Sequence, residues 1–275
     1  MNISQLIARV AEELKSSSID SFAAEAREIV AHQLKMSKAQ LSMHEIRGLQ
    51  VSEDDLQKII KLSSDRAKRV PLQHLMGKSY FRNLALDVGP GVFIPRPETE
   101  TLVELALELE LPERSLFEVG AGSGAISISL TEESDFDATA MEISEDSAKW
   151  TRKNIENYGN RVELIIGDFE NHMPIRQYGL LISNPPYIPS HAIPVDPEVN
   201  LHDPAVALYS GEDGLDLIRL LAKSKNYLHP GGMLLFEHDE SQRADIVELL
   251  LDKDWKEIQS FKDLNGRDRF IQAVA

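Results

Sequence analysis

The chain has 275 residues, a formal net charge of −16 and no cysteine. That length suits one large domain or two smaller ones, and the absence of cysteine excludes disulfides, zinc–thiolate sites and thiol nucleophiles, which fits the cytosol. The negative charge argues against binding nucleic acid by phosphate neutralisation, and no apolar run approaches the ~20 residues of a membrane helix.

Residues 1 to 70 have the apolar spacing of a small helical bundle. A first helix is predicted from five apolar residues at intervals of three or four: Ile3, Leu6, Ile7, Val10 and Leu14. A second helix is expected to begin after Asp20 as its N-cap, and a short third helix to cover Lys38–His44. Ser52–Asp55 resembles a capping box and predicts a fourth helix. The basic residues that follow are interpreted as a solvated helix face: Lys61, Arg66, Lys68 and Arg69.

The segment 71–97 is predicted to be a hairpin that links the helical bundle to the rest of the chain. Tyr80, Phe81, Leu84 and Leu86 alternate loosely with other residues, as strand residues do. Gly89-Pro90-Gly91 is a turn signal, and a short apolar run follows it at residues 92–94.

Residues 98 to 275 alternate short apolar runs with helical stretches. The runs fit strands buried on both faces: Ser115–Val119, Ala138–Ile143, Val162–Ile166, Leu180–Ser183 and Met233–Phe236. The helical stretches are Ala125–Thr131, Ser144–Tyr158, Gly214–Tyr227 and Glu240–Leu251. This alternation predicts an α/β fold with a parallel sheet covered by helices on both faces, and a final hairpin of Ile258–Phe261 and Arg269–Ala273. Ligands of such sheets bind at the carboxyl ends of the strands.

A glycine-rich turn follows the first of these strands, at Gly120-Ala121-Gly122-Ser123-Gly124. Its glycines allow a sharp turn and the close approach of a ligand. The spacing differs from the dinucleotide fingerprint Gly-x-Gly-x-x-Gly, which weakens a nicotinamide interpretation without removing it. Glu118, just before the turn, either stabilises a cationic ligand such as a sulfonium or caps the turn, and both roles stay open.

Two acidic residues end the next two strands. Glu142 lies about twenty residues after the glycines, where a carboxylate can accept hydrogen bonds from ribose hydroxyls. Asp168 can accept from an adenine amino group, and Phe169 can stack on the adenine ring. Each feature alone is common, but a glycine turn and two acids on three successive strands together predict a nucleoside pocket.

Asn184-Pro185-Pro186-Tyr187 follows the fourth strand and suits methyl transfer from a sulfonium to a planar nitrogen. Asn184 Oδ1 and the Pro185 carbonyl can accept the two N–H groups of an amide or aniline-like substrate and aim its nitrogen. The two prolines fix the backbone, and Tyr187 offers a flat face to the substrate group. No strong base is needed, because the nitrogen becomes acidic once it is methylated. The alternative, a merely rigid loop, is less favoured at this position.

Together these motifs resemble the HemK/PrmC family of bacterial protein-(glutamine-N5) methyltransferases, over nearly the whole chain. The resemblance includes Ile94-Pro95-Arg96-Pro97-Glu98-Thr99-Glu100, the glycine turn and Asn184–Tyr187. It continues through Asp213-Gly214-Leu215 and Pro230-Gly231-Gly232. Asn-Pro-Pro-Tyr alone is shared with adenine-N6 and other amino methyltransferases, whereas its combination with Ile-Pro-Arg-Pro-Glu-Thr-Glu is much more specific.

The resemblance implies a Rossmann-like, seven-stranded methyltransferase domain over residues 98–275 and an N-terminal domain, 1–70, that helps to recognise a protein partner. It implies that S-adenosylmethionine binds at Gly120–Gly124, Glu142, Asp168, Phe169 and Asn184, and that a glutamine in the Gly-Gly-Gln loop of a release factor meets Asn184–Tyr187. The chain departs from the family at several positions. Glu118 and Glu142 stand where Asp is usual, Ala121 replaces Thr or Cys, and Glu237-His238-Asp239 replaces Glu-Ile-Gly.

Other functions remain as alternatives. A ribosomal-protein glutamine is a second target for the same chemistry. A nucleic-acid amino methyltransferase acting on a flipped base would need a basic channel, which the charge disfavours. A non-catalytic binding module is disfavoured by the intact Asn184, Pro185 and Tyr187. The histidines, including His74, His202 and His238, lack metal-ligand spacing, so no metal is expected. We expect a cytoplasmic monomer whose partner is a release factor, without membrane or stable nucleic-acid binding.

Overall fold

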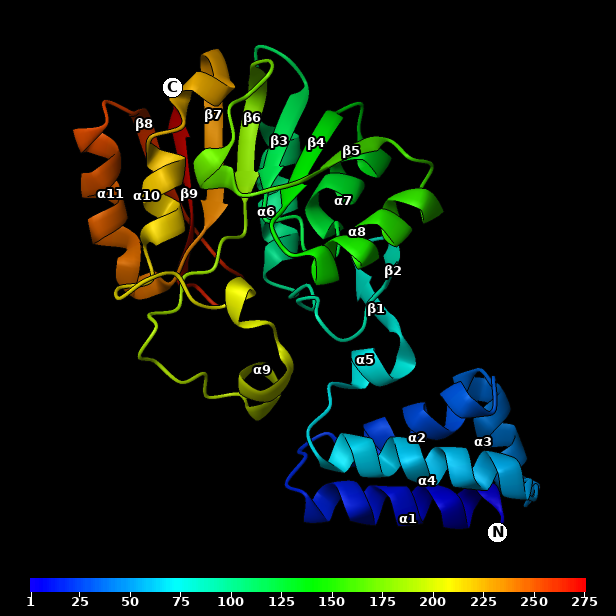
Figure 1. Ribbon diagram of the computed structural model, residues 1–275. Coiled ribbons are helices and arrows are strands. Elements are labelled where there is room, and N and C mark those ends of the chain that lie inside the picture. Colours follow the sequence, from blue (N-terminus) through cyan, green and yellow to red (C-terminus); the bar gives the residue numbers. More distant parts are fainter. The chain divides into compact units, whose positions relative to one another are not determined.

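The computed structural model describes residues 1–275, which form two compact units. The first unit comprises Met1–Gly77 and the later segment Pro194–His202, and the second comprises Lys78–Ile193 and Asp203–Ala275. Figure 1 labels their elements, and each unit is described by itself. No helix in either unit has the length and apolar character needed to span a bilayer.

The first unit is entirely helical. Its elements are α1 (Ile3–Ser16), α2 (Phe22–Gln33), α3 (Lys38–Ile46), α4 (Glu53–Ala67), α5 (Leu72–Met76) and α9 (Pro197–His202). The four predicted helices are confirmed. The spacing of Ile3, Leu6, Val10 and Leu14 along α1 places these four side chains in the core, with apolar residues of α2. The short α5 and α9 were not predicted, because five or six residues are too few to show a helical period.

Two predictions about this unit were wrong. The N-cap of α2 is Ser21 and not Asp20; the Ser21 hydroxyl donates to Glu25 Oε1 at 2.6 Å instead of accepting from the helix. Arg66 is also no solvated residue, since it is only 6% exposed. Its guanidinium contacts Glu25 of α2 (Nε–Oε2, 2.5 Å) and Glu198 of α9 (Nη1–Oε1, 2.7 Å). A buried ion pair of this kind needs partners from distant segments, which helical spacing cannot indicate.

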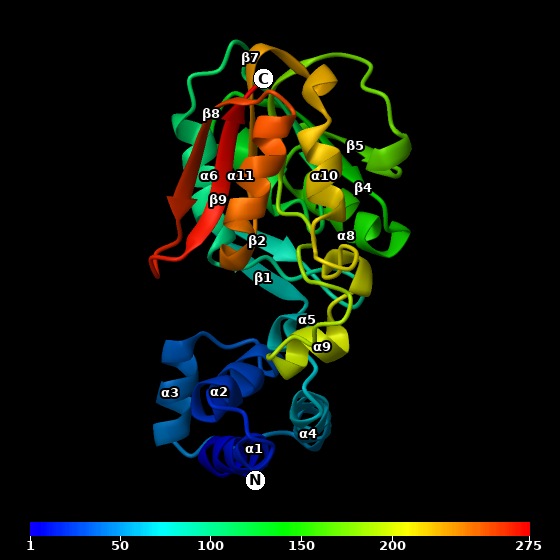
Figure 2. The same ribbon diagram turned by 90° about the vertical axis from the view of Figure 1, so that its left-hand side faces the viewer.

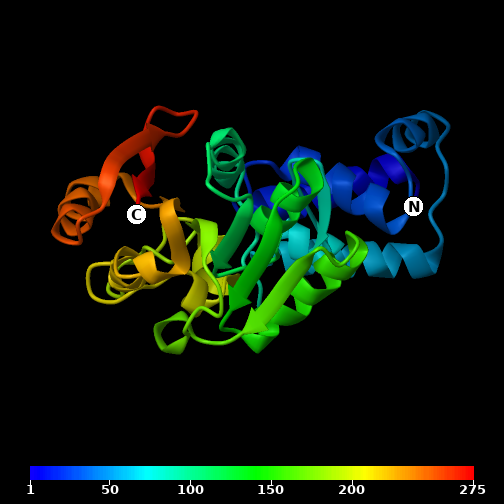
Figure 3. The same ribbon diagram turned by 90° about the horizontal axis from the view of Figure 1, so that it is seen from above.

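The second unit is built on a seven-stranded sheet with the order β5-β4-β3-β6-β7-β9-β8. Its strands are β3 (Ser115–Val119), β4 (Asp137–Glu142), β5 (Val162–Ile166), β6 (Tyr178–Ser183), β7 (Leu228–Glu237), β8 (Lys256–Lys262) and β9 (Asp268–Val274). The first five are parallel, and β9 runs antiparallel to both β7 and β8. The predicted α/β fold and the final hairpin are therefore confirmed. Seen from above, that hairpin lies at the end of the sheet opposite β5 (Figure 3).

Helices cover both faces of the sheet. On one face, α6 (Thr99–Glu108), α7 (Ala125–Glu133) and α8 (Glu145–Asn157) pack over strand residues such as Leu116, Leu180 and Ile182. On the other, α10 (Asp216–Ala222) and α11 (Arg243–Asp252) pack over Phe117 and Leu181. Figure 2 shows α10 and α11 together on one side of the sheet. Neighbouring strand residues point to opposite faces, so both faces of each strand are buried.

A two-stranded antiparallel hairpin, β1 (Lys78–Phe81) and β2 (Leu84–Asp87), precedes the sheet, as predicted. Residues 92–94 that follow it are not a strand. Helix α6 was not predicted, and its first residue, Thr99, belongs to the Pro-rich segment 94–100. Thr99 lies at the carboxyl edge of the sheet, where its hydroxyl contacts Glu237 at the end of β7.

Candidate active site

The motifs singled out in the sequence converge on one edge of the sheet. Strand pairing sets Val119 opposite both Met141 and Ser183, and Glu142 opposite Ile166. The segments that leave the carboxyl ends of β3, β4, β5 and β6 therefore start side by side. This edge is where ligands of open parallel sheets bind.

The glycine turn has the backbone conformation that requires glycine. Gly120, Gly122 and Gly124 have φ values of +78°, +57° and +84°. A Cβ at Gly124 would lie 2.9 Å from Ile128 Cδ1, so this glycine allows α7 to pack, whereas a Cβ at Gly120 or Gly122 would meet nothing within 4 Å. The first two glycines thus border open space at the edge of the sheet, and the third serves helix packing.

Glu142 connects the end of β4 to this turn. Its Oε2 accepts from the backbone N–H of Gly122 at 2.8 Å, and its Oε1 accepts from that of Ser144 at 2.9 Å. Each carboxylate oxygen has a second lone pair that these bonds do not use. The side chain therefore fixes the turn and keeps the capacity to accept further hydrogen bonds, as a ribose would require.

Glu118 contacts the helix that follows the glycine turn and forms no hydrogen bond with the turn itself. Its Oε2 accepts from the Ser127 hydroxyl and from the Ser127 backbone N–H (3.1 Å) in the first turn of α7. The residue is 1% exposed and has no cationic partner. Burial raises the pKa of Glu118 to about 8, and the nearby Glu142 adds to the rise, although the bonds from Ser127 act against it. A second role towards a cationic ligand stays a prediction.

Asp168 and Phe169 follow β5. The Asp168 carboxylate accepts from the Glu170 backbone N–H (3.0 Å) and from Asn171 Nδ2 (2.9 Å), so it orders its own turn. The Phe169 ring lies in the core, with its centroid 6.3 Å from that of Phe117 and 5.0 Å from that of Tyr227. The observed contacts of both residues are within the protein, and their predicted contacts with adenine stay predictions.

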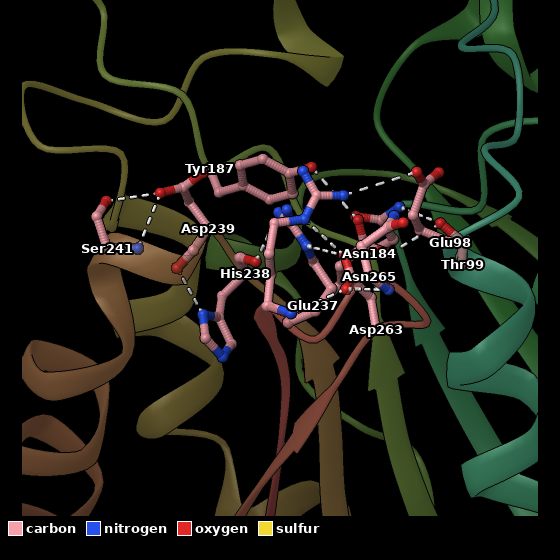
Figure 4. A network of polar contacts seen from close by, with 12 residues as sticks. Glu98, Thr99, Asn184, Tyr187, Glu237, His238, Asp239, Ser241, Asp263 and Asn265 are labelled. Carbon is pink, nitrogen blue, oxygen red and sulfur yellow. Dashed lines mark hydrogen bonds and ion pairs between the residues drawn. The ribbon is translucent and has the colours of Figure 1, made fainter.

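Asn184 is held by residues that the sequence analysis did not select (Figure 4). Its Nδ2 donates to Thr99 Oγ1 at 3.0 Å, and the Thr99 hydroxyl donates to Glu237 Oε2 at 2.8 Å. The Tyr187 hydroxyl donates to the other oxygen, Glu237 Oε1, at 3.3 Å. Two features of the sequence could have indicated these residues: Thr99 belongs to the Pro-rich motif, and Glu237 lies at the end of a predicted strand.

The backbone of the Asn184–Tyr187 loop is fixed as well. Gln242 Nε2 donates to the carbonyl oxygens of Tyr187 (2.9 Å) and Asp213 (3.2 Å). At Gly214, whose φ is +80°, a Cβ would stand 2.2 Å from the Tyr187 carbonyl oxygen. Only glycine permits this approach, which explains physically why Asp213-Gly214 accompanies the loop.

The electrostatics of this network are unusual for carboxylates. Burial raises the pKa of Glu237 to about 7, although the hydrogen bond from Thr99 and the charge of Arg269 act in the opposite direction. Burial, with the charge of Glu237, also raises the pKa of Tyr187. His238, which is fully buried, has its pKa lowered by burial. No group of three or more His, Cys, Asp or Glu side chains is arranged to hold a metal ion.

Known proteins resemble this chain over most of its length. Residues 5–77 match the model of the PrmC N-terminal domain, and residues 86–200 match that of the methyltransferase small domain. A release factor glutamine methyltransferase of Streptomyces coelicolor is 44% identical over 76% of this chain and 77% of the relative. One of Mycobacterium tuberculosis is 34% identical over 100% of this chain and 92% of the relative. A methyltransferase structure from Pyrococcus furiosus has a TM-score of 0.53 at 20% identity, covering 77% of this chain and 98% of that one, and shows the shared fold.

Proposed function

This chain belongs to the family of release factor glutamine methyltransferases, and we propose that it methylates the side-chain amide nitrogen of the glutamine in the Gly-Gly-Gln loop of a release factor. It is an S-adenosylmethionine-dependent methyltransferase. The observation that carries the proposal is the orientation of Asn184, whose Nδ2 is engaged by Thr99 while its Oδ1 accepts no hydrogen bond from the protein.

The residues at the carboxyl edge of the sheet fit S-adenosylmethionine. The backbone at Gly120 and Gly122 borders open space, and Glu142 keeps unused lone pairs for hydroxyl donors. We propose that the cofactor is held by these residues with Glu118, Ala121, Ser123, Gly124, Asp168, Phe169 and Asn184. When bound, it supplies an electrophilic methyl group on a sulfonium.

The chain's own residues would orient the acceptor. Asn184 Oδ1 and the Pro185 carbonyl oxygen accept the two N–H groups of the glutamine amide, which places its nitrogen in one direction. Pro185 and Pro186 limit the motion of the loop, and Tyr187, fixed through its hydroxyl and its carbonyl oxygen, presents a ring face to the substrate side chain. The nitrogen loses its proton to water or a carbonyl after methylation, so no strong base is required.

A methyl-transfer assay with labelled S-adenosylmethionine tests this proposal. We expect label on a purified release factor and none on the same factor with alanine in place of the glutamine of its Gly-Gly-Gln loop. Label on both would show another acceptor residue. No label on either, with cofactor binding intact by calorimetry, would refute the release factor as substrate, and ribosomal proteins would then be assayed in its place.

The remaining features of the proposal concern the state in which the enzyme works. We propose that it acts as a cytoplasmic monomer, because its substrate takes part in translation and its acidic surface suits a protein partner better than nucleic acid. Sedimentation at the concentrations of the assay would show a single species of about 30.8 kDa. A stable dimer would contradict the monomer proposal without affecting the chemistry.

A further inference from the structure

Glu237 is a buried carboxylate that the proposed reaction does not use directly. It is the last residue of β7 and is 2% exposed. Its two oxygens accept from two hydroxyls, those of Thr99 and Tyr187, and it forms no ion pair within 4 Å. Burying a carboxylate without a paired cation is costly, so these two hydroxyls are its principal compensation. Such an arrangement points to a role beyond stability.

The chemistry of the donors gives the network a direction. An ionised carboxylate only accepts hydrogen bonds, and a hydroxyl has a single hydrogen to donate. The Thr99 hydrogen is therefore directed at Glu237, and the Thr99 oxygen is left to accept from Asn184. An amide rotated by 180° would set Asn184 Oδ1 against this oxygen with no hydrogen between them. The carboxylate thus determines which end of the Asn184 amide faces Thr99 and which end is left without a hydrogen bond from the protein (Figure 4).

We propose that Glu237 is a positioning residue that acts through Thr99 to keep Asn184 Oδ1 directed at the substrate amide. This inference rests on the proposed function of Asn184. It also assigns a purpose to Thr99, the first residue of α6, because Thr99 is the only group between the two side chains. Tyr187 is held by the same carboxylate, so the acceptor and the ring that flank the substrate share one anchor.

The protonation state of Glu237 would then control the orientation of Asn184. A protonated Glu237 can donate to Thr99, which frees the Thr99 hydrogen to point at Asn184. The amide can then turn and present Nδ2, a donor, to a substrate that also donates. The groups that face Glu237 are Glu98 from the start of α6, Tyr187 from the loop after β6 and Arg269 from β9. With the pKa of Glu237 raised to about 7, turnover should fall as the pH is lowered through this value.

The decisive experiment compares the parent enzyme with Glu237→Gln, which keeps the shape of the side chain but supplies a donor. We expect turnover with the release factor to fall about 10- to 100-fold, as when a hydrogen bond to a charged group is lost. The calorimetric Kd for S-adenosylhomocysteine should stay within about twofold and the thermal midpoint within a few degrees, because Glu237 contacts Thr99 and Tyr187 and not the glycine turn or Glu142. The rise of parent turnover from about pH 6 to pH 8 should be absent in the variant.

A second pair of variants keeps the inference testable if Glu237→Gln folds poorly. Thr99→Ser preserves the relay and should retain turnover, whereas Thr99→Val removes it and should lose as much as Glu237→Gln. Glu248→Gln, on an exposed face of α11, is the matched control and should behave as the parent.

Three outcomes would overturn the inference. The first is full turnover in Glu237→Gln, and the second is a pH dependence of turnover in this variant that equals that of the parent. The third is a loss of turnover that follows a loss of thermal stability and of cofactor binding. Absence of transfer by the parent itself would instead count against the proposed function.

Discussion

The two units bury charge in opposite ways. In the helical unit, Arg66 is enclosed by Glu25 and Glu198, and Arg69 also reaches Glu198 at 3.1 Å. In the sheet unit, Glu118 and Glu237 are buried with hydroxyl and amide donors but no paired cation. Opposite charges in contact make burial tolerable and serve the fold, whereas an uncompensated carboxylate is retained where chemistry needs it.

The pKa directions follow this difference. Burial alone would raise the pKa of Glu198, but hydrogen bonds that include those from Arg66 and Arg69 lower it to about 2. Burial raises the pKa of Glu118, which has no cation near it, to about 8. It raises the pKa of Glu237 to about 7, because the more distant charge of Arg269 only partly opposes it. Substitutions of charged or polar groups should therefore lower mainly stability in the first unit, and should change mainly activity, or the pH dependence of activity or stability, in the second.

The largest effect is expected from Arg66→Ala. Removing this guanidinium leaves Glu25 and Glu198 without their shared cation, and breaking a buried pair in this way costs about 3–5 kcal/mol of unfolding free energy. Urea unfolding followed by circular dichroism measures the loss. Arg27→Ala, which breaks the more exposed pair with Glu45, is the control and should cost about 0–1 kcal/mol. Similar losses in both variants would contradict a structural role for the buried cluster.

Asn184→Ala should affect turnover instead of stability. Loss of one preorganised group that contacts the reacting atoms lowers turnover about 10²- to 10³-fold, or about 2.7–4 kcal/mol in the activation free energy. The labelled-methyl assay measures turnover, with calorimetry of cofactor binding and thermal unfolding alongside. We expect the thermal midpoint to stay near the parent value and cofactor binding to weaken far less than turnover, because the glycine turn and Glu142 still hold the cofactor. Equal turnover in variant and parent would refute the orienting role of Asn184.

Glu142→Ala should act on the cofactor. The change removes the acceptor proposed for the ribose and also releases the backbone N–H groups of Gly122 and Ser144. We expect S-adenosylhomocysteine to bind about 10- to 100-fold more weakly, or about 1.4–2.8 kcal/mol. Isothermal titration calorimetry measures the Kd. An unchanged dissociation constant would exclude Glu142 from the cofactor site.

Glu118→Gln should show its effect in the pH dependence of stability. In the unfolded chain Glu118 ionises near pH 4.5, whereas in the folded chain burial delays ionisation to about pH 8. The parent therefore loses stability as the pH rises between these values, because the unfolded state releases its proton first. The variant lacks this loss, so it should gain stability over the parent as the pH rises towards 8 and equal the parent near pH 4. Denaturant unfolding gives the unfolding free energy of parent and variant across this pH range. If the two free energies changed with pH in the same way, the raised pKa of Glu118 would be refuted.

Much of the architecture followed from local patterns in the sequence. Short apolar runs such as Ser115–Val119 marked the buried strands, and the spacing of Ile3, Leu6, Val10 and Leu14 marked the face of α1. These patterns indicate which side of a helix or strand is buried, and a few consecutive residues are enough to show it. The glycine turn and the Asn184–Tyr187 loop were located in the same way, because each directly follows a strand.

The contacts between distant segments were decided by the tertiary structure alone. Thr99 and Glu237 are 138 residues apart, and Arg66 and Glu198 are 132 apart. Nothing near either residue in the chain indicates its partner, so Arg66 was taken for a solvated residue and Glu237 was not selected. The sequence by itself determined most of the elements, their order and the edge at which a ligand is expected, since periodicity and strand ends are local properties. The orientation of Asn184 and the charge balance of the interior depended on packing, because hydrogen bonds and ion pairs need partners that only the folded chain brings within 3 Å.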